Sequence, residues 1–449
     1  MSQPVIVETS PATPGLRDPV ARAVCALPIA IAPALLFYFG LIPNVVPTGL
    51  FLAGCLGVSA LAAWLCPLRV VLGVAIAGSC FGTVLAGADL IWRLRPPAQF
   101  YYRPDEMFLH HWQPMPTLAR YDTNVNYAGR TYGDLAAMAA RPDWREYRPI
   151  TFRSDSAGFP NAQSPSAGVD TILIGDSYGA GTGTRREATW AVLLQSRYHL
   201  NLYNLSIPES GPWHEMMNLK IMAPSLPRAK RTVVLWAFFT GNDLDDDCWD
   251  QLEPVLANGF FSRLRVSLAT FRNRSPIFQL ADHIAKGPPE QRAIEKYAAP
   301  GRRILFRPAY ARRARRTLEE VEHHEHYATM LAVFRSMRDF AARQNLTIAV
   351  ALLPSKEEVY AQLLDGEPGA TRSSRPSALS VVVERESRLD GFAFLDLKPF
   401  FVAEAARRLA ADGQLMWWSD DTHWNERGHA FAADVVFNRL LQPLLNGSH

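Results

Sequence analysis

A chain of 449 residues is long enough for two or three folding units, and a formal net charge of only +3 argues against a nucleic-acid partner. Four of the five cysteines lie before residue 81 in apolar sequence, and only Cys248 follows them, so the later part of the chain has no internal disulfide. No two cysteines have metal-ligand spacing, and the histidine-rich stretch 323–326 is typical of a solvated polar segment. We therefore expect neither a metal site nor an organic cofactor.

The N-terminal part of the chain predicts a membrane anchor. Residues 1–22 form a tail, and no charged side chain occurs from Ala23 to Leu68. A transmembrane helix needs about 20 apolar residues, so three spans fit, near residues 23–43, 48–66 and 70–92. A cleaved signal peptide is the alternative, but its apolar core is only about 7–15 residues long. Residues 23–92 are therefore predicted to be a transmembrane region.

Positive charges beside the spans predict their orientation. Arg17 and Arg22 precede the first span, and Arg69 lies between the second and the third. If these arginines are cytoplasmic, three spans place everything after residue 93 on the outer side of the membrane. Three further arginines between residues 93 and 103 oppose this orientation. We expect a multi-pass protein of the cell inner membrane with an extracytoplasmic (periplasmic) catalytic domain.

The remainder of the chain predicts one α/β domain. Residues 93–150 carry aromatic and proline-rich pieces and are predicted to be a juxtamembrane linker, while residues 151–449 alternate apolar strands with helical patterns. Strands are expected at 171–174, 202–205, 232–239, 346–353 and 392–395, and helices near 187–198, 212–222, 326–344, 399–411 and 426–442. This alternation is typical of a parallel sheet covered on both faces. The predicted fold class is therefore α/β, a three-layer parallel-sheet domain preceded by about three transmembrane helices, with an insertion near 245–325.

A serine and a histidine stand in segments that suit nucleophilic catalysis. Gly175-Asp176-Ser177 directly follows the first strand, and Asp420-Asp421-Thr422-His423 lies near the C-terminus. A serine hydroxyl is a poor nucleophile until a base within hydrogen-bond reach takes its proton, and an imidazole can both accept and return that proton. Ser177 is therefore the candidate nucleophile and His423 the candidate base, with either Asp420 or Asp421 orienting the ring.

N–H groups near the serine are candidates for stabilising the oxyanion of the tetrahedral intermediate. Ser177 and Asn242 each follow the carboxyl end of a strand, and in a parallel sheet such ends open onto one crevice. The expected donors are the backbone N–H groups of Ser177 and Gly211 and the side-chain amide of Asn242. Structural alternatives stay open, because Ser177 could simply cap a helix and His423 could stand at an ordinary helix entry.

These segments resemble the Ser, Gly, Asn and His blocks of the SGNH (GDSL-type) hydrolase superfamily, over roughly residues 150–445. The resemblance implies an acyl-enzyme formed on Ser177, with His423 as the base. The glycine block departs from the family pattern: a few residues after Asn204, Glu209 stands where the oxyanion-hole glycine is usual, and Gly211 lies two positions further on. The donor from this block is therefore uncertain.

The histidine segment narrows the resemblance. Asp421-Thr422-His423-Trp424-Asn425, followed by Gly428, resembles the Asp-x-His-Trp-Asn segment of SGNH domains related to alginate O-acetyltransferases, and residues 152–159 and 353–360 are similar to other segments of that group. The group typically moves or removes O-acetyl groups of polysaccharides outside the cytoplasm, in some cases beside a multi-span membrane acyltransferase. In the alginate enzyme the histidine segment precedes the nucleophile, whereas here it follows.

The predicted function is that of a membrane-anchored serine O-acyl esterase or O-acyltransferase. It would act through an acyl-Ser177 intermediate on O-acetyl groups of an envelope or secreted polysaccharide, with a multi-span membrane acyltransferase as a possible partner. Two alternatives stay open: an esterase for lipids or small esters, and a non-catalytic subunit of a polysaccharide export or modification complex. The loss of the block glycine at Glu209 is the best argument for the non-catalytic alternative.

Overall fold

The computed structural model describes Val84, Arg103 and the ranges 108–110, 120–139, 141–166, 168–245, 293–365 and 375–447. The chain divides into two units, and all described residues except Val84 belong to the second unit, Arg95–Ser262 with Ile284–His449. The three predicted membrane spans, apart from Val84, lie outside the described residues. Among the helices that are described, none combines the length and the apolar character needed to cross a bilayer.

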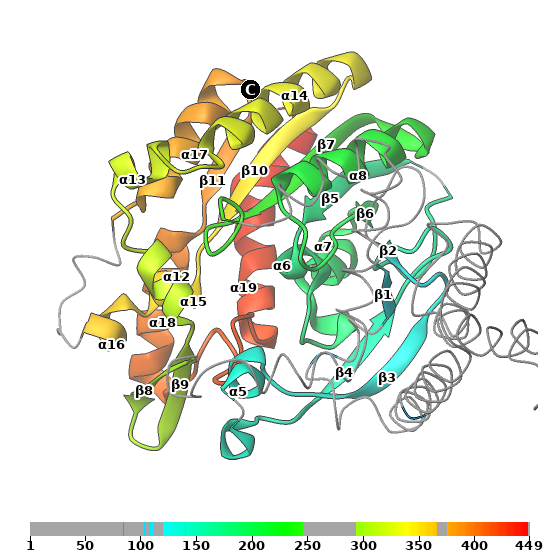
Figure 1. Ribbon diagram of the computed structural model, residues 1–449. Helices are drawn as coiled ribbons and strands as arrows, with labels where there is room; N and C mark the ends of the chain where they lie inside the picture. Colours follow the sequence, from blue (N-terminus) through cyan, green and yellow to red (C-terminus); the bar gives the residue numbers. More distant parts are fainter. Residues whose placement is uncertain are drawn as a thin grey trace, which may run out of the picture. The chain divides into compact units, whose positions relative to one another are not determined.

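The second unit is built on a five-stranded parallel sheet (Figure 1). Its strands are β5 (Val169–Gly175), β6 (Leu202–Asn204), β7 (Arg228–Phe239), β10 (Thr347–Leu353) and β11 (Ala393–Asp396). All five strands predicted from the apolar runs are therefore confirmed, with ends shifted by a few residues. The largest shift is at β7, which begins at Arg228 because its first residue pairs with Val169 beyond an irregularity in β5.

The order of the strands predicts a crevice between β5 and β7, beyond their carboxyl ends. Across the sheet the order is β11-β10-β7-β5-β6. The first strand along the chain, β5, therefore lies between the second and the third. In a sheet of this order the connections leave the first and third strands toward opposite faces, and ligands bind at that switch point, beyond the carboxyl ends of the strands. Ser177 follows β5 and Asn242 follows β7, so both lie at the switch point.

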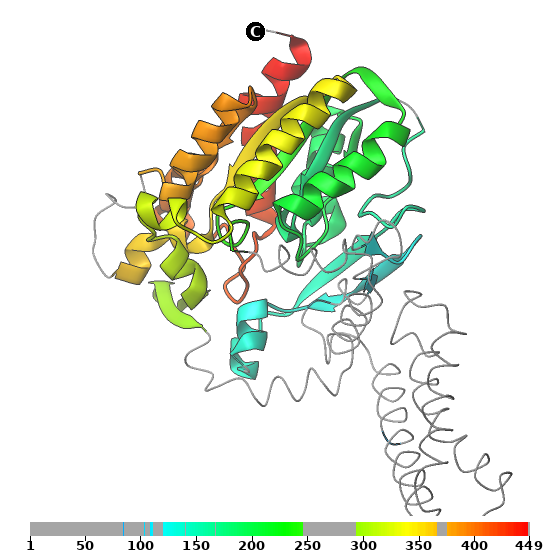
Figure 2. The same cartoon turned by 45° about the horizontal axis from the view of Figure 1, so that its top comes forward.

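Helices cover both faces of the sheet, as the three-layer prediction requires. The helices of the second unit are α5 (Asp134–Met138), α6 (Ser177–Ala180), α7 (Trp190–Tyr198), α8 (Pro212–Met222), α12 (Pro308–Arg313), α13 (Leu318–Glu322), α14 (Tyr327–Gln344), α15 (Lys356–Val359), α16 (Ala361–Asp365), α17 (Ala378–Leu389), α18 (Lys398–Asp412), α19 (Glu426–Val436) and α20 (Gln442–Asn446). Helices α8, α14 and α17 lie on one face, and α7, α18 and α19 on the other (Figures 1 and 2).

The strand side chains divide between two apolar cores. In β7 the residues at positions 234, 236 and 238 pack with α8, α14 and α17, and the odd-numbered positions 233–239 pack with α7, α18 and α19. Successive side chains of a strand point to opposite faces, so a strand buried on both faces reads as a continuous apolar run. This is why the central strands were recognisable in the sequence.

Part of the predicted linker 93–150 folds with the α/β domain. A short pair of strands, β1 (Leu109–His110) and β2 (Arg120–Tyr121), precedes the hairpin of β3 (Asn126–Thr131) and β4 (Arg148–Arg153). Between β3 and β4, α5 and Trp144 form an apolar cluster with Leu305. Two amides of α5, those of Leu135 and Ala136, donate hydrogen bonds to the Asp420 carbonyl. Residues 120–150 therefore belong to the domain that carries the histidine segment.

The predicted insertion near 245–325 is only partly described. Its later half contains the antiparallel hairpin of β8 (Ile294–Ala299) and β9 (Arg302–Phe306), followed by α12 and α13. Asp245, at the start of the insertion, forms ion pairs with Arg313 and Arg316 near its end. These ion pairs hold the two ends of the insertion together. The stretch 246–292 lies outside the described residues.

Candidate active site

The nucleophile candidate stands at a tight junction of strand and helix. The buried strand β5 ends at Gly175, and Ser177 is the first residue of α6. Asp176 is the N-cap of this helix, and its Oδ1 atom accepts a hydrogen bond of 2.8 Å from the Tyr178 amide. At the first position of a helix the backbone N–H has no intrahelical acceptor. The junction therefore places both the hydroxyl and the backbone N–H of Ser177 at the edge of the sheet where the strands have their carboxyl ends.

The structure brings Ser177, His423 and Asp421 into one hydrogen-bonded chain. His423 Nε2 lies 2.7 Å from Ser177 Oγ, and His423 Nδ1 lies 2.9 Å from Asp421 Oδ1. Asp421 is fully buried, and His423 is 6% exposed. This is the arrangement in which a carboxylate fixes the imidazole so that its second nitrogen faces the hydroxyl.

Side chains from both ends of the domain hold the histidine segment in place. Asn425 caps α19 through the amides of Arg427 and Gly428, and its own Nδ2 atom donates to the carbonyls of Leu415 and Trp417. The Tyr178 hydroxyl donates a 2.5 Å hydrogen bond to the carbonyl of Thr422. The residue after the serine thus reaches the residue before the histidine, which fixes the two segments relative to each other.

Asp420 and Asp421 have different partners. The Asp420 carboxylate accepts hydrogen bonds of 2.7 Å from the amides of Gly133 and Glu146, and one of 3.0 Å from Arg148. Each of these contacts joins the histidine segment to residues 133–148. Gly133 lies so close that a Cβ atom there would be 1.9 Å from the Asp420 carbonyl oxygen. Of the two carboxylates left open by the sequence, Asp421 contacts the imidazole and Asp420 anchors the surrounding loop.

Arg148 links both carboxylates and was not identified from the sequence. Its Nη2 atom donates a hydrogen bond of 2.5 Å to Asp421 Oδ2, and its Nη1 atom donates one of 3.0 Å to Asp420 Oδ1. Its Nε atom donates a third hydrogen bond to the carbonyl of Gly183. The side chain is 4% exposed and lies over the Trp418 ring. Arg148 is thus a positioning residue for Asp421. No local pattern reveals it, because the two carboxylates that it binds lie more than 270 residues further along the chain.

Arg103 and Asp134 complete the charged group around the imidazole. The Arg103 guanidinium forms ion pairs with Asp134 at 2.8 Å and with Asp421 at 2.9 Å, and its Nη2 and Nη1 atoms lie 2.8 and 3.3 Å from His423 Nδ1 and Nε2. Asp134, Asp421 and His423 are close enough together to hold a metal ion. Here the guanidinium supplies the positive charge between the two carboxylates, so we assign no metal to this group.

The tautomer of His423 depends on whether Asp421 or Arg103 binds its Nδ1 atom. A ring nitrogen that donates its proton to Asp421 cannot also accept one from Arg103. Only the tautomer protonated at Nδ1 leaves Nε2 able to accept the Ser177 proton. Burial, and after it the charge of Arg103, lowers the pKa of His423 below its usual value, against the opposing effect of Asp421. Burial favours a raised pKa for Asp421, but Arg103, His423 and Arg148 outweigh it and hold that pKa well below the usual value.

The predicted oxyanion donors lie in turns at the same edge of the sheet. The turn before Gly211 is tied to the nucleophile strand, because the Ile207 amide and the Ser210 hydroxyl donate to the Gly175 carbonyl at 3.1 and 3.2 Å. Gly211 is the N-cap of α8. Asn242 lies in the turn after β7, which Asp243 fixes by accepting a 2.7 Å hydrogen bond from Phe239. Donation by Gly211 and Asn242 to an oxyanion stays a prediction.

Glu209 retains the backbone conformation typical of a glycine. Its φ angle is +60°, in the left-handed region, and its side chain is exposed. A residue with a Cβ atom adopts this region at a cost of about 1–2 kcal/mol, which glycine does not incur. The turn between β6 and α8 therefore has the shape that the missing block glycine would favour, although the residue is different.

Lys356 supports the histidine segment from beneath. Its side chain is fully buried, which is rare for a lysine. Its Nζ atom donates to the carbonyls of Asp421 and, at 3.2 Å, Trp418. Lys356 therefore binds two backbone carbonyls of the histidine segment and is not available to bind an anion at the surface.

The comparisons with known proteins bear on the C-terminal part of the chain. Residues 311–448 match the family model described as the SGNH hydrolase-like domain of the acetyltransferase AlgX. The matched range contains Asp421 and His423, whereas Ser177 lies outside it. No match was found among curated proteins.

Solved structures also resemble the chain. One is titled "Crystal structure of an acetyl xylan esterase AlAXEase"; it is 11% identical, the alignment covers 61% of this chain and 100% of the other, and the TM-score is 0.33. At this identity and TM-score the likeness says nothing about the substrate of this chain.

Proposed function

We propose that the chain is a serine O-acyl esterase or O-acetyltransferase that works through an acyl-Ser177 intermediate. The observation that carries the proposal is the unbroken hydrogen-bonded chain from Ser177 Oγ through the His423 ring to Asp421, at the switch point of the sheet. The match of residues 311–448 to an SGNH hydrolase-like acetyltransferase domain also supports it, since the matched range contains Asp421 and His423, although not Ser177.

The geometry defines the order of proton transfers. Ser177 Oγ attacks the carbonyl carbon of the ester while His423 Nε2 takes the hydroxyl proton, and Asp421 stabilises the imidazolium that forms. Collapse of the tetrahedral intermediate breaks the ester C–O bond, and the imidazolium returns the proton to the departing alcohol. In the second half, His423 takes a proton from water or from an acceptor hydroxyl, which attacks the acyl-enzyme and releases Ser177. Water yields an acid, and a sugar hydroxyl yields a new ester.

The substrate class proposed is an O-acetylated polysaccharide of the cell envelope or a secreted one. The likeness of the histidine segment to alginate O-acetyltransferase-related domains and the AlgX match support this class. We further propose that apolar residues 23–92 anchor the protein in the inner membrane, with the α/β domain on the extracytoplasmic side. A multi-span membrane acyltransferase is the partner that would supply acetyl groups in that setting.

Hydrolysis of p-nitrophenyl acetate by the full chain tests the acyl-enzyme. We expect Ser177→Ala to reduce kcat by roughly 10³-fold or more, since loss of the nucleophile disables the whole triad. Ser225→Ala is the matched control, because this serine is exposed and, among the residues that the structure describes, its hydroxyl bonds only to the nearby Met222 carbonyl. A fluorophosphonate probe should label the wild type and the Ser225→Ala variant but not Ser177→Ala. Equal hydrolysis and labelling in the Ser177→Ala variant would contradict the proposal.

Acceptor competition separates esterase from transferase. Labelled acetyl released from an acetylated oligosaccharide appears as acetate in an esterase, and on an added glycan acceptor in a transferase. A chain that is silent in both assays and is not labelled by the probe would instead behave as the non-catalytic subunit considered above.

A further inference from the structure

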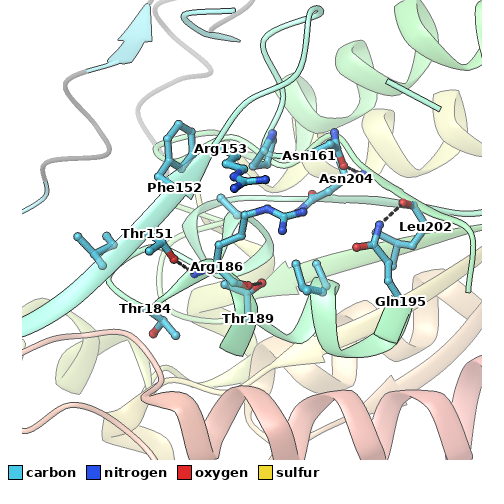
Figure 3. A pocket seen from close by; sticks show the side chains of 16 residues that line it. Thr151, Phe152, Arg153, Asn161, Thr184, Arg186, Thr189, Gln195, Leu202 and Asn204 are labelled. Atoms are coloured by element: carbon cyan, nitrogen blue, oxygen red, sulfur yellow. Dashed lines mark hydrogen bonds between the residues drawn. The ribbon is translucent and has the colours of Figure 1, made fainter. Parts of the chain in front are cut away.

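A hollow beside the end of the nucleophile helix α6 is lined by polar and basic side chains. It has about 450 Å³ of unfilled space, including the part that opens to solvent, and lies between β4 and α7. The polar and basic side chains that line it are those of Thr151, Arg153, Asn161, Thr184, Arg186, Thr189, Gln195 and Asn204 (Figure 3). We call it the Arg153–Arg186 hollow. Its floor includes Ala180 and Gly181, which directly continue the helix that Ser177 begins.

Arg186 extends into this hollow and forms no ion pair with a carboxylate of the described residues. Figure 3 shows its side chain crossing the space toward Asn161 and Asn204. Its backbone amide is fixed by a 3.0 Å hydrogen bond to Thr151 Oγ1, but its buried Nε atom has no hydrogen-bond partner within the described ranges. Burial lowers the pKa of Arg186, and the charge of Arg153 adds to this, while Glu187 opposes it. A buried donor left without a partner costs about 1–3 kcal/mol, so an occupant that accepts from it would be stabilised.

Arg153 adds a second positive charge at the same place. Its Nε atom donates 3.1 Å to Asn126, and no other hydrogen bond of its guanidinium is found in the described part of the chain. Two carboxylates on neighbouring segments already have hydrogen-bond partners. Glu187 is exposed and accepts from Thr151, and Asp155 accepts from Tyr203 and from two backbone amides. Neither carboxylate bonds to either guanidinium, although the charge of Glu187 acts on both arginines. Two guanidinium groups against this one carboxylate leave the hollow a net positive charge.

The first turn of α7 faces the same hollow. Ala191 and Val192, its second and third residues, line the space. The N-cap residue Thr189 provides no side-chain cap, because its hydroxyl donates to the Arg186 carbonyl. The Trp190 amide already donates to His429 Nδ1 at 3.4 Å, and the next two amides of the turn belong to Ala191 and Val192. Amides at a helix start carry a partial positive charge and suit anions. The amides come from a different element than the two arginines, so the two observations point to a negative ligand independently.

We propose that the Arg153–Arg186 hollow binds an oxoanion group of the phosphate, sulfate or carboxylate class. An arginine fork matches the paired oxygens of such groups and holds them by charge-assisted hydrogen bonds, and the amides of Ala191 and Val192 at the start of α7 add further donors. The space suits one charged group rather than a whole oligosaccharide. The group either belongs to a free anion or is carried by an acidic sugar of the glycan, and in the second case the inference rests on the proposed function.

The position of the hollow connects an occupant to the active site. The segment 180–184 separates the two: the Gly181 amide donates to the Ser177 carbonyl, and Thr184 donates to the Trp424 carbonyl beside His423. An anion bound by Arg186 would therefore rest on the segment that fixes both Ser177 and the histidine segment. This contact predicts that binding stabilises the folded chain.

Isothermal titration of the full-length Ser177→Ala chain tests the site without any turnover. The titrants are inorganic phosphate, sulfate and an oligogalacturonate, each at constant ionic strength against potassium chloride, with a neutral acetylated oligosaccharide for comparison. We expect saturable binding with a Kd on the order of 1 mM, weakened about tenfold or more by Arg186→Gln, which removes the charged fork. Arg185→Gln is the matched control, because the neighbouring Arg185 is exposed and pairs with Glu426.

The two sources of the anion give different titrations. If oligogalacturonate binds more tightly than phosphate and loses this advantage in Arg186→Gln, a glycan carries the group. If phosphate or sulfate binds more tightly, the ligand is a free anion.

Thermal unfolding provides a second measurement, since a ligand of the folded state raises Tm in the wild type and in Arg185→Gln but not in Arg186→Gln. The absence of saturable binding up to about 50 mM for all charged titrants, or equal affinity in Arg186→Gln, would overturn the inference. Because Ser177→Ala is inactive under the proposed function, these results are independent of whether catalysis is found.

Discussion

Asp420 and Asp421 are adjacent in the chain but face different partners, and two matched substitutions should separate their contributions. Asp421 contacts His423 Nδ1, so Asp421→Asn should lower kcat about 10³–10⁴-fold by removing the acceptor that selects the productive tautomer. Asp420 accepts from two backbone amides and Arg148. Asp420→Asn should instead reduce the unfolding free energy by about 1–3 kcal/mol, with a much smaller change in kcat.

Esterase kinetics and urea unfolding on both variants provide the measurement. Circular dichroism of Asp421→Asn controls for misfolding. A larger fall of kcat in Asp420→Asn than in Asp421→Asn, with both variants folded, would show that the hydrogen-bond geometry assigns the two carboxylates the wrong way round.

The pH dependence of activity should report the charge of Arg103. The base must be neutral to take the Ser177 proton, so kcat/KM should rise with pH through the pKa of His423, which burial and Arg103 hold below its usual value of 6.5. The cation disfavours the imidazolium. Removing it in Arg103→Gln should therefore raise that pKa and move the acidic limb of the profile to higher pH.

A pH–rate series from about pH 4 to 8 on the wild type, Arg103→Gln and Arg103→Lys checks this. Arg103→Lys retains the charge and should leave the limb near its wild-type position, whereas a merely steric role would move both variants alike. If the acidic limb of the kcat/KM profile stays in place or moves to lower pH in Arg103→Gln, the electrostatic explanation is contradicted.

At the scale of elements, local patterns predicted the strands but not the contacts between distant segments. The buried strands were visible because both faces of the sheet are covered, and Ser177, Asn242 and His423 followed recognisable segment ends. Residues 120–150 were misjudged, because β3 is a largely exposed strand with an irregular pattern and its anchor is Asp420, far along the chain. Arg148 and Asp134 were missed for the same reason: a partner chosen by tertiary folding leaves no trace in sequence spacing.

The turn between β6 and α8 gives a test at this scale. Glu209 adopts φ of +60° with an exposed side chain. Glu209→Gly should remove the Cβ strain of the left-handed conformation and raise the unfolding free energy by up to about 1 kcal/mol, after the extra entropy of glycine in the unfolded chain is deducted. Urea unfolding measures the change.

Glu209→Ala is the control, because it removes the carboxylate but keeps the Cβ atom and should not gain this stability. We expect esterase activity to be retained in both variants, since the backbone shape of the turn is already that of a glycine. If alanine stabilises as much as glycine, the carboxylate rather than the backbone is the source of the strain.

At the scale of the whole molecule, stability should depend on a buried acid that takes no part in the proposed reaction. Glu357 is 1% exposed, and its Oε1 atom accepts a 2.7 Å hydrogen bond from the Arg307 amide. Burial raises its pKa to about 7, although the adjacent Lys356 acts in the opposite direction. The folded chain thus holds a proton that the unfolded chain has already lost between pH 4.5, the ordinary value, and about pH 7.

The sign of the pH effect follows from this extra proton. Because the folded state binds more protons across the window, the unfolding free energy contributed by Glu357 is highest below pH 4.5 and falls as pH rises to about 7. Glu357→Gln removes the titration, so the variant should gain on the order of 2–3 kcal/mol relative to the wild type between about pH 5 and pH 8. Denaturant unfolding at about pH 5 and about pH 8 measures this gain.

Glu384→Gln is the control. It removes a carboxylate paired with the exposed Arg388 on the surface of α17 and should show almost no such gain. A gain of equal size in the surface variant would mean that long-range charge, and not the burial of Glu357, controls the pH response of the fold.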